Sequence, residues 1–374
     1  MIRRLLSSIA LVLPLSVLAA QPAAPAVEAR SFILIDGQSN QTLVAGNADM
    51  RIEPASLTKL MTAYLTFKSL REGQLKLDQM LTVSREAQSR EGSRMFVDAR
   101  VPVSVDDLIK GVIVQSGNDA CVVLAEALAG SEQGFVQLMN REAQRLGLAN
   151  THYLDSTGLT GEGQYTTAED LAKLAQAIIR DFPEYYPIYS MKSFSYNNIK
   201  QDNRNLLLYR DAEVDGLKTG HTSTAGYNLV SSTKRDGRRL IAVVTGTTSM
   251  EARARESAKL LNWGTSVWET PRLFTAGQEV RNLPVYKGQT NNVRVGVAND
   301  HYLTIPRGAA AALVQEITLP THLVAPLTAG QQVGSLRVRD GDTVLAEYPL
   351  AVLDEVQQGS WWRRLIDTIR LWFA

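Results

Sequence analysis

The chain has 374 residues, more than one hydrophobic core usually takes, so we expect two domains. Apolar residues make up 45% and charged residues 21%, an ordinary balance for a globular protein. The formal net charge of +1 provides no basic field and excludes nucleic acid as a partner, and the single cysteine, Cys121, excludes an internal disulfide. Cys121 lies in an apolar stretch, so we expect a small buried side chain and not a reactive thiol.

Residues 1–20 have the pattern of a secretory signal peptide. Two arginines precede an apolar run from Leu5 to Leu18, and two alanines ending at Ala20 follow it. The run is interrupted by serines and a proline and is short for a membrane span, so we predict export and cleavage after Ala20. Removal of residues 1–20 brings the formal net charge to about −1.

A strand and a helix open the first predicted domain, residues 31–270. Ser31–Asp36 is rich in β-formers and follows an Ala- and Pro-rich lead-in. Pro54 then precedes an apolar periodic stretch that extends to Leu70, which predicts a helix with Ser56 in its first turn. The positive end of this helix would lie beside Ser56.

Two further helices are predicted on either side of a short polar turn. Ser104 with two following acids predicts a helix that ends near Gln115. A second helix is expected over residues 119–128, before Gly130. Ser116 and Asn118 would then lie on a tight turn, where polar side chains point into a cleft.

The rest of this domain combines one more helix with antiparallel strands. Thr166 and Glu169 form a capping-box pattern before an amphipathic helix. Strands are predicted over residues 216–222, 227–233 and 240–246. The order of elements predicts an α/β (α+β) domain with a mixed antiparallel sheet and helices on both faces.

The C-terminal part differs in composition. Short apolar runs separated by turn residues predict a small all-β sandwich domain over residues 272–356. Residues 359–374 predict an amphipathic helix with Trp362, Leu365, Ile366, Ile369, Trp372 and Phe373 on one face and arginines largely on the other. This pattern favours attachment to a membrane surface; the alternative is a helix packed on the body of the protein.

Three separated motifs carry the chemistry. Ser56 and Lys59 are three residues apart on one helix face, so Ser56 is the candidate nucleophile and Lys59 the candidate base. Lys59 must be uncharged to act as a base, and we expect the helix end and a second cation, Lys218, to lower its pKa. Ser116 is a candidate proton donor to the leaving amine, and Asn118 offers an amide to the substrate backbone.

The third motif is the strand segment Lys218–His221. An edge strand here can pair with an extended peptide, and the backbone N–H groups of Ser56 and His221 can converge on an oxyanion. The substrate predicted by these residues is peptide-like.

The ordered set Ser-x-x-Lys, Ser-x-Asn and Lys-Thr-Gly resembles that of penicillin-binding proteins and serine β-lactamases. Residues 116–121, 155–159, 203–205 and 214–222 are similar to the D-alanyl-D-alanine carboxypeptidases, low-molecular-mass penicillin-binding proteins of the five and six type. The resemblance runs from about Ser31 to the C-terminus. It implies a penicillin-binding, β-lactamase-like transpeptidase domain that removes the terminal D-alanine from peptidoglycan pentapeptides in the periplasm, at the inner membrane.

The resemblance also implies roles for individual residues. Penicillin and other β-lactams would acylate Ser56, with Lys59 as base and Ser116 and Asn118 as the second motif. The third motif would comprise Lys218, Thr219, Gly220 and His221, and Arg204 would help to hold the terminal carboxylate of the substrate. The region between Thr82 and Met95 is shorter than the corresponding loop near the active site of the family. The deacylation rate and the access of substrate are therefore the properties that the resemblance implies least.

Several alternatives share parts of this pattern. A class A β-lactamase uses a Glu-x-x-x-Asn pattern, which is absent between Asn118 and Lys218. A D,D-endopeptidase acting on peptide cross-links would use the same motifs, and a non-enzymatic membrane-surface scaffold would leave them unused. No cofactor or metal is expected, because the four histidines (His152, His221, His301 and His322) lack the spacing of metal ligands.

Overall fold

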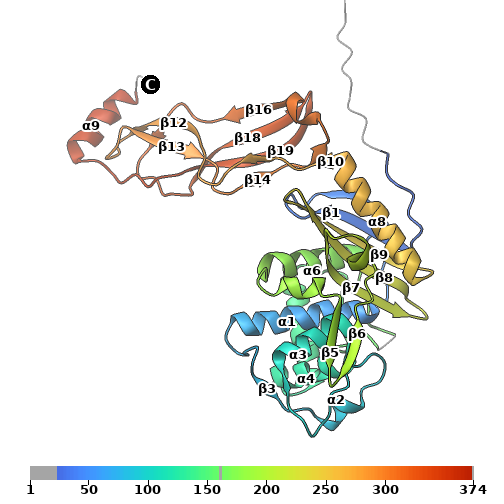
Figure 1. Ribbon diagram of the computed structural model, residues 1–374. Helices are drawn as coiled ribbons and strands as arrows, with labels where there is room; N and C mark the ends of the chain where they lie inside the picture. The colour runs from blue at the N-terminus through green and yellow to red at the C-terminus, as the bar shows by residue number, and fades with distance from the viewer. Residues whose placement is uncertain (1–22, 160–161, 373–374) are drawn as a thin grey trace, which may run out of the picture. The chain divides into compact units, whose positions relative to one another are not determined.

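The computed structural model describes residues 23–159 and 162–372 (Figure 1). The predicted signal peptide, residues 1–20, and Phe373 of the tail lie outside the described residues. The chain divides into two compact units, Ala24–Thr270 and a second unit that begins at Pro271. All the residues singled out for chemistry belong to the first unit.

A five-stranded sheet with the order β2-β1-β9-β8-β7 forms the centre of the first unit. Each of its pairings is antiparallel. Its strands are β1 Ser31–Asp36, β2 Thr42–Gly46, β7 Val214–Thr222, β8 Gly226–Arg235 and β9 Arg238–Thr247. The four strands predicted here are confirmed, and β7 lies at an edge of the sheet. Asp236 and Gly237 both have positive φ, which suits the tight turn between β8 and β9.

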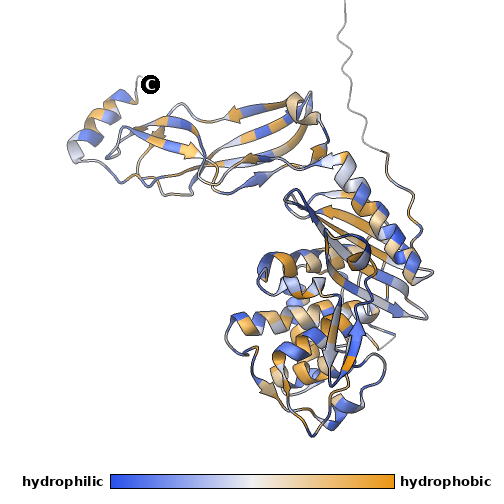
Figure 2. Cartoon of the chain, viewed as in Figure 1, coloured by the Kyte–Doolittle hydropathy of each residue, from blue (hydrophilic) through white to orange (hydrophobic). Residues whose placement is uncertain are grey.

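The two faces of the sheet pack against different helices, as predicted. Along β1, Ile33 and Ile35 belong to the core that includes helix α6, Ala168–Asp181, whereas Leu34 faces helix α8, Met250–Val267. This alternation follows from the period of two in a β-strand. Figure 1 shows α6 and α8 on opposite sides of the sheet, and Figure 2 shows many hydrophilic residues along α8 beside mostly hydrophobic strands.

A group of helices packs on the α6 side around the largest core. Its longer helices are α1 Lys59–Arg71, α4 Asn118–Ala129 and α5 Glu132–Arg145. The shorter ones are α2 Arg85–Ser89, α3 Val105–Lys110, the 3-10 turns η1 Ala55–Thr58 and η3 Tyr186–Ser190, and the π-helical turn η2 Gly111–Gln115. Helix α7, Leu207–Arg210, belongs instead to the smaller core on the α8 side. Short strands complete the unit, namely β3 Met80–Leu81, β4 Val103–Ser104, β5 Ser193–Tyr196, β6 Ile199–Asp202 and β10 Trp268–Glu269.

Helix caps confirm most predicted boundaries and correct one. Ser104 Oγ accepts from the backbone N–H of Asp107, as expected for the start of α3. The cap of α6, however, is Thr167, whose Oγ1 accepts from the N–H of Asp170. The predicted capping box is therefore one residue too early, because the pattern of a hydroxyl followed three residues later by an acid occurs twice in succession here.

The second unit is an all-β domain, as predicted. Its six-stranded sheet has the order β16-β18-β19-β13-β12-β17, with a parallel pair between β12 and β17. The strands of the unit are β11 Arg272–Phe274, β12 Glu279–Tyr286, β13 Asn292–Gly296, β14 His301–Tyr302, β15 Ile305–Pro306, β16 Leu313–Thr318, β17 Leu323–Val324, β18 Gln332–Asp340 and β19 Thr343–Val352, with a 3-10 turn η4 Ala309–Ala312. Inward-facing side chains such as Val295, Leu336 and Leu350 form its separate core.

The chain ends in helix α9, Trp361–Arg370, which packs on the β domain through its polar side. Asp367 is only 4% exposed and accepts from the backbone N–H of Lys287 at 2.7 Å, and Arg363 donates to two carbonyls of the domain. The opposite side leaves Trp361, Trp362, Leu365, Ile366 and Ile369 48–59% exposed. Within the residues that the structure describes, no helix has the length and apolarity needed to span a membrane.

Candidate active site

Ser56 lies in the 3-10 turn η1, which leads directly into α1. The sequence predicts a single helix here, whereas the structure changes from 3-10 to α-helix at Lys59. In a 3-10 turn, residues three apart lie on the same side. Lys59 Nζ accordingly donates to Ser56 Oγ at 3.1 Å. The two predicted partners are therefore within hydrogen-bonding distance.

Lys59 is almost completely buried, with 1% of the residue exposed. Its Nζ also donates to the backbone carbonyl of Thr157 at 2.7 Å. Burial lowers the pKa of Lys59 from its usual value, and the nearby charge of Arg204 acts in the same direction. Desolvation, and not a second lysine, is thus the main cause. The proximity of Lys59 lowers the pKa of Lys218 instead.

Ser116 and Asn118 lie on the turn between η2 and α4. Ser116 has a left-handed backbone, with φ of 64°, which turns its side chain out of the preceding helix. Asn118 begins α4, and its Nδ2 donates to the carbonyl of Glu91 at 2.6 Å. The tight turn predicted between two helices is confirmed, with a π-helical turn before it.

Lys218 reaches this turn from β7. Its Nζ donates to Ser116 Oγ at 2.9 Å and to the carbonyl of Thr219 at 3.1 Å. Burial lowers its pKa well below the usual value, and repulsion by Lys59, Arg204 and Arg253 adds to the effect. The ammonium form of Lys218 is therefore destabilised in the folded protein.

The rest of the Lys-Thr-Gly-His segment follows along the same edge strand. Gly220 packs closely against η1, since a Cβ atom there would lie 3.1 Å from both Leu57 Cγ and the Pro54 carbonyl. The ring of His221 stacks on that of Tyr227 from β8, with centroids 3.9 Å apart. Close packing of β7 on η1 thus sets the third motif beside Ser56.

A cavity of about 380 Å³ connects the three motifs. Of the predicted site residues, those that line it are Ser56, Ser116, Asn118, Arg204, Thr219, Gly220 and His221. Lys59 and Lys218 lie behind the wall and reach it through Ser56 and Ser116. All nine predicted residues therefore come together in one place.

Arg204 follows the β5–β6 hairpin and borders the cavity. Its Nη1 donates to Ser93 Oγ at 2.8 Å, and burial lowers its pKa. Ser93 belongs to the loop after α2 and was not predicted from the sequence, because a serine in a polar loop has no distinguishing local pattern.

Arg253 is a second lining residue that the sequence did not indicate. It lies on α8, is 3% exposed, and donates to the carbonyls of Gly220 and Arg204, each at 3.2 Å. Burial and the nearby Arg204 lower its pKa to about 10. Arg253 thus ties the third motif to Arg204. Its burial comes from tertiary packing and has no local sequence signal.

Cys121 lies close to this site but is not part of its surface. It is fully buried, and its Sγ lies 3.2 Å from the carbonyl of Gly117. Burial raises the pKa of its thiol to about 12. The prediction of a small buried residue is confirmed.

The chain is similar to known proteins along both of its units. The family model described as D-alanyl-D-alanine carboxypeptidase matches residues 18–249, and that of the penicillin-binding protein 5 C-terminal domain matches residues 268–358. The chain is 42% identical to D-alanyl-D-alanine carboxypeptidase DacA of Escherichia coli over 94% of its own length and 89% of that protein. It is 33% identical to DacF of Bacillus subtilis, over 92% and 90% of the two chains.

A solved structure agrees with these relatives. Penicillin-binding protein 5 from Haemophilus influenzae superposes with a TM-score of 0.86 at 42% identity and covers 90% of this chain and 100% of that one. The match includes the catalytic unit and the all-β unit, so it is not confined to one motif. The chain belongs to the D-alanyl-D-alanine carboxypeptidase family of serine hydrolases and is of the penicillin-binding protein 5 type.

Proposed function

We propose that the chain removes the terminal D-alanine from peptidoglycan pentapeptides through an acyl-enzyme on Ser56. The observation that carries this proposal is the buried Lys59 amine, which contacts Ser56 Oγ at 3.1 Å and has a lowered pKa. A neutral amine in this position can take the serine proton, whereas a solvated lysine would be protonated.

In the acylation step, Ser56 Oγ attacks the carbonyl carbon of the D-Ala–D-Ala bond, and its proton moves to Lys59 Nζ. The developing oxyanion is held by the backbone N–H groups of Ser56 and His221. The edge strand β7 offers main-chain groups to the extended substrate, since one side of β7 has no strand partner within the sheet.

Collapse of the tetrahedral intermediate breaks the C–N bond. Ser116 Oγ gives its proton to the leaving amine and regains one from Lys218, which is hydrogen-bonded to it at 2.9 Å and which recovers its own proton from Lys59. Asn118 holds the substrate amide. D-Alanine leaves, and the proton that Lys59 took from Ser56 passes to Lys218, so that both lysines return to their starting protonation states. Neutral Lys59 then accepts a proton from the attacking water and returns it to Ser56 Oγ as the ester bond breaks. The proton taken from Ser56 is balanced by the one given to the amine.

The charges around the cavity favour an anionic substrate. Arg204 and Arg253 line it, and none of its lining residues is acidic. We assign Arg204, Thr219 and Gly220 to the terminal carboxylate. A β-lactam carries a carboxylate in a similar place, and one relative, penicillin-binding protein D2 from Listeria monocytogenes, has been solved with ampicillin bound. That structure is 28% identical over 66% of this chain, with a TM-score of 0.60.

The substitution Ser56→Ala tests this function. It should abolish both D-alanine release from a D-Ala-D-Ala peptide and covalent labelling by a fluorescent penicillin, without unfolding the chain. Labelling that persists would place the nucleophile elsewhere. In the same assay a cross-linked peptide dimer tests for endopeptidase activity, and rapid turnover of the penicillin would indicate a β-lactamase.

We further propose that the exported protein works in the periplasm, attached to the inner membrane through α9. The exposed apolar side chains of α9, with arginines beside them, support this placement. Deletion of residues 360–374 should abolish flotation with anionic lipid vesicles while hydrolysis of a soluble peptide continues. Loss of both properties would show that α9 serves the fold and not attachment.

A further inference from the structure

The segment Asp155–Leu159 forms the support behind the lysine base. Lys59 Nζ has two hydrogen-bond partners among the described residues, Ser56 Oγ at 3.1 Å and the carbonyl of Thr157 at 2.7 Å. Only the second of these is independent of the reacting serine. The position of the Thr157 carbonyl therefore sets the direction in which the buried amine points.

The carboxylate of Glu132 binds this segment at Ser156. Glu132 Oε1 accepts from the backbone N–H of Ser156 at 3.0 Å and from Ser156 Oγ at 2.6 Å. The Ser156 carbonyl, in turn, accepts from Thr62 Oγ1 of helix α1 at 2.7 Å. Ser156, the residue just before Thr157, is thus fixed at both its N–H and its C=O groups, and the N–H of Thr157 donates to Asp155 Oδ1 at 2.7 Å.

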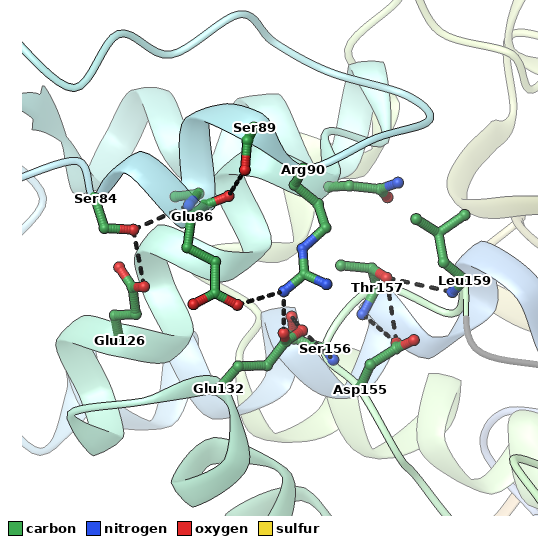
Figure 3. Close-up of polar contacts among 12 residues, drawn as sticks. Ser84, Glu86, Ser89, Arg90, Glu126, Glu132, Asp155, Ser156, Thr157 and Leu159 are labelled. Atoms are coloured by element: carbon green, nitrogen blue, oxygen red, sulfur yellow. Dashed lines mark hydrogen bonds and ion pairs between the residues drawn. The ribbon is translucent and has the colours of Figure 1, made fainter.

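Glu132 is itself fixed by its helix and by a cation. It is the first residue of α5, where the helix dipole favours a negative charge. Its second oxygen pairs with Arg90, which also pairs with Glu86 of α2 at 3.3 Å. Figure 3 shows the chain of contacts from Arg90 through Glu132 to Ser156, with Asp155 and Thr157 beside it.

We propose that Glu132, held by Arg90, is a positioning residue for the base: it fixes Ser156 so that the Thr157 carbonyl keeps the Lys59 amine aimed at Ser56. The inference rests on the proposed role of Lys59. Neither Glu132 nor Arg90 lines the cavity, so both act through Ser156.

The physical reason is the sensitivity of proton transfer to geometry. A displacement of about 1 Å can slow a reaction by roughly 100-fold. Without Glu132, the backbone N–H of Ser156 loses its acceptor and the loop can shift away from Lys59. The Thr157 carbonyl also stabilises the protonated amine, so its withdrawal lowers the pKa of Lys59 further.

Other titratable groups lie near Lys59 and near Glu132. Lys59 interacts electrostatically with Asp155, Asp119, the Cys121 thiol and Arg204, and it lowers the pKa of Lys218. Glu132 faces Arg90, with Glu86 beyond it. The other carboxylates near Lys59 remain when Glu132 is replaced. A change in the pH profile therefore reflects the displacement of the loop and the loss of the Glu132 charge.

The test measures the rate of acylation by a fluorescent penicillin as a function of pH, using the full chain. Glu132→Ala should lower the plateau rate about tenfold or more and move the acidic limb to lower pH. Glu132→Gln should retain most of the rate, because its amide oxygen still accepts from Ser156. The matched control is Glu126→Ala, since Glu126 lies nearby on α4 but accepts from Ser84 at 2.9 Å and not from the loop (Figure 3).

Three outcomes overturn the proposal: a rate in Glu132→Ala within twofold of the parent with an unchanged limb, an equal loss in Glu126→Ala, or an equal loss in Glu132→Gln. If Glu132→Ala does not fold, Arg90→Ala provides the second test and should show a smaller loss in the same direction; an unchanged rate refutes the idea. Failure of the proposed function gives a different result: either penicillin does not label the parent chain, or it still labels the Ser56→Ala variant.

Discussion

Replacement of Asp119 should destabilise the catalytic unit strongly. Asp119 is 1% exposed and accepts from the backbone N–H groups of Met95 at 3.0 Å, Phe96 at 2.8 Å and Val97 at 3.2 Å. In Asp119→Ala these three donors lose their acceptor. The Met95 and Val97 residues are buried, and an unsatisfied buried donor costs about 1–3 kcal/mol, so we expect a total loss of about 3–5 kcal/mol.

The effect should reach the active site. Asp119 follows Asn118, and the loop that it holds continues from Ser93, whose carbonyl accepts from the N–H of Asn118 at 2.7 Å and whose hydroxyl accepts from Arg204. Loosening this loop should therefore slow penicillin acylation as well as lower stability. Asp119→Asn keeps one side-chain oxygen as an acceptor and should lose about half as much free energy.

Urea unfolding followed by circular dichroism measures the change. Asp106→Ala is a suitable control, because Asp106 is a partly exposed carboxylate paired with Lys110 on α3, and its removal should change the free energy of unfolding by about 0.5 kcal/mol or less. A loss below about 1 kcal/mol in Asp119→Ala would mean that water or a rearranged loop satisfies the three donors, which would refute the reasoning.

Three further expectations follow from the site. Penicillin acylation should rise with pH and level off below 10.5, because burial lowers the pKa of Lys59 and the amine is neutral above that lowered value. A rate that still increases through 10.5 would contradict this. Gly158→Ala should abolish penicillin labelling and destabilise the chain, because the φ of Gly158 is +89° and a Cβ atom there would lie 1.7 Å from the Ala55 carbonyl oxygen. The control is Gly147→Ala, where φ is +70° but the space is open, and it should lower the free energy of unfolding, measured by thermal unfolding, by only about 1 kcal/mol. Cys121 should react with a maleimide only in denaturant, because it is buried and its pKa is raised to about 12; rapid reaction of the native chain would show that the pocket opens there.

Local patterns in the sequence explain why so much of the catalytic unit could be predicted. The strands have strong β-formers, and Ser104 and Gly130 mark helix ends by capping rules that depend only on neighbouring residues. The shift of the α6 cap from Thr166 to Thr167 shows the limit of such rules, because two adjacent threonines each satisfy them. Three short motifs likewise predict candidate reacting groups, and these residues lie around one cavity in the structure.

The parts that could not be predicted depend on tertiary packing. The lowered pKa of Lys59 comes mainly from burial, whose extent no local pattern reports. Arg253 reaches Gly220 from a helix that follows the sheet in sequence, and an arginine on a helix is usually solvated. Glu132 is likewise an ordinary first-turn acid until the fold brings Ser156 to it.

The docking of α9 through Asp367 and Arg363 has a consequence for handling the protein in solution. Because the charged side of α9 is hydrogen-bonded to the β domain, the helix cannot rotate about its axis to bury its tryptophans. Concentrated samples without detergent should therefore self-associate through the exposed apolar side of α9. A bilayer that binds this side would also set the orientation of the β domain relative to the membrane.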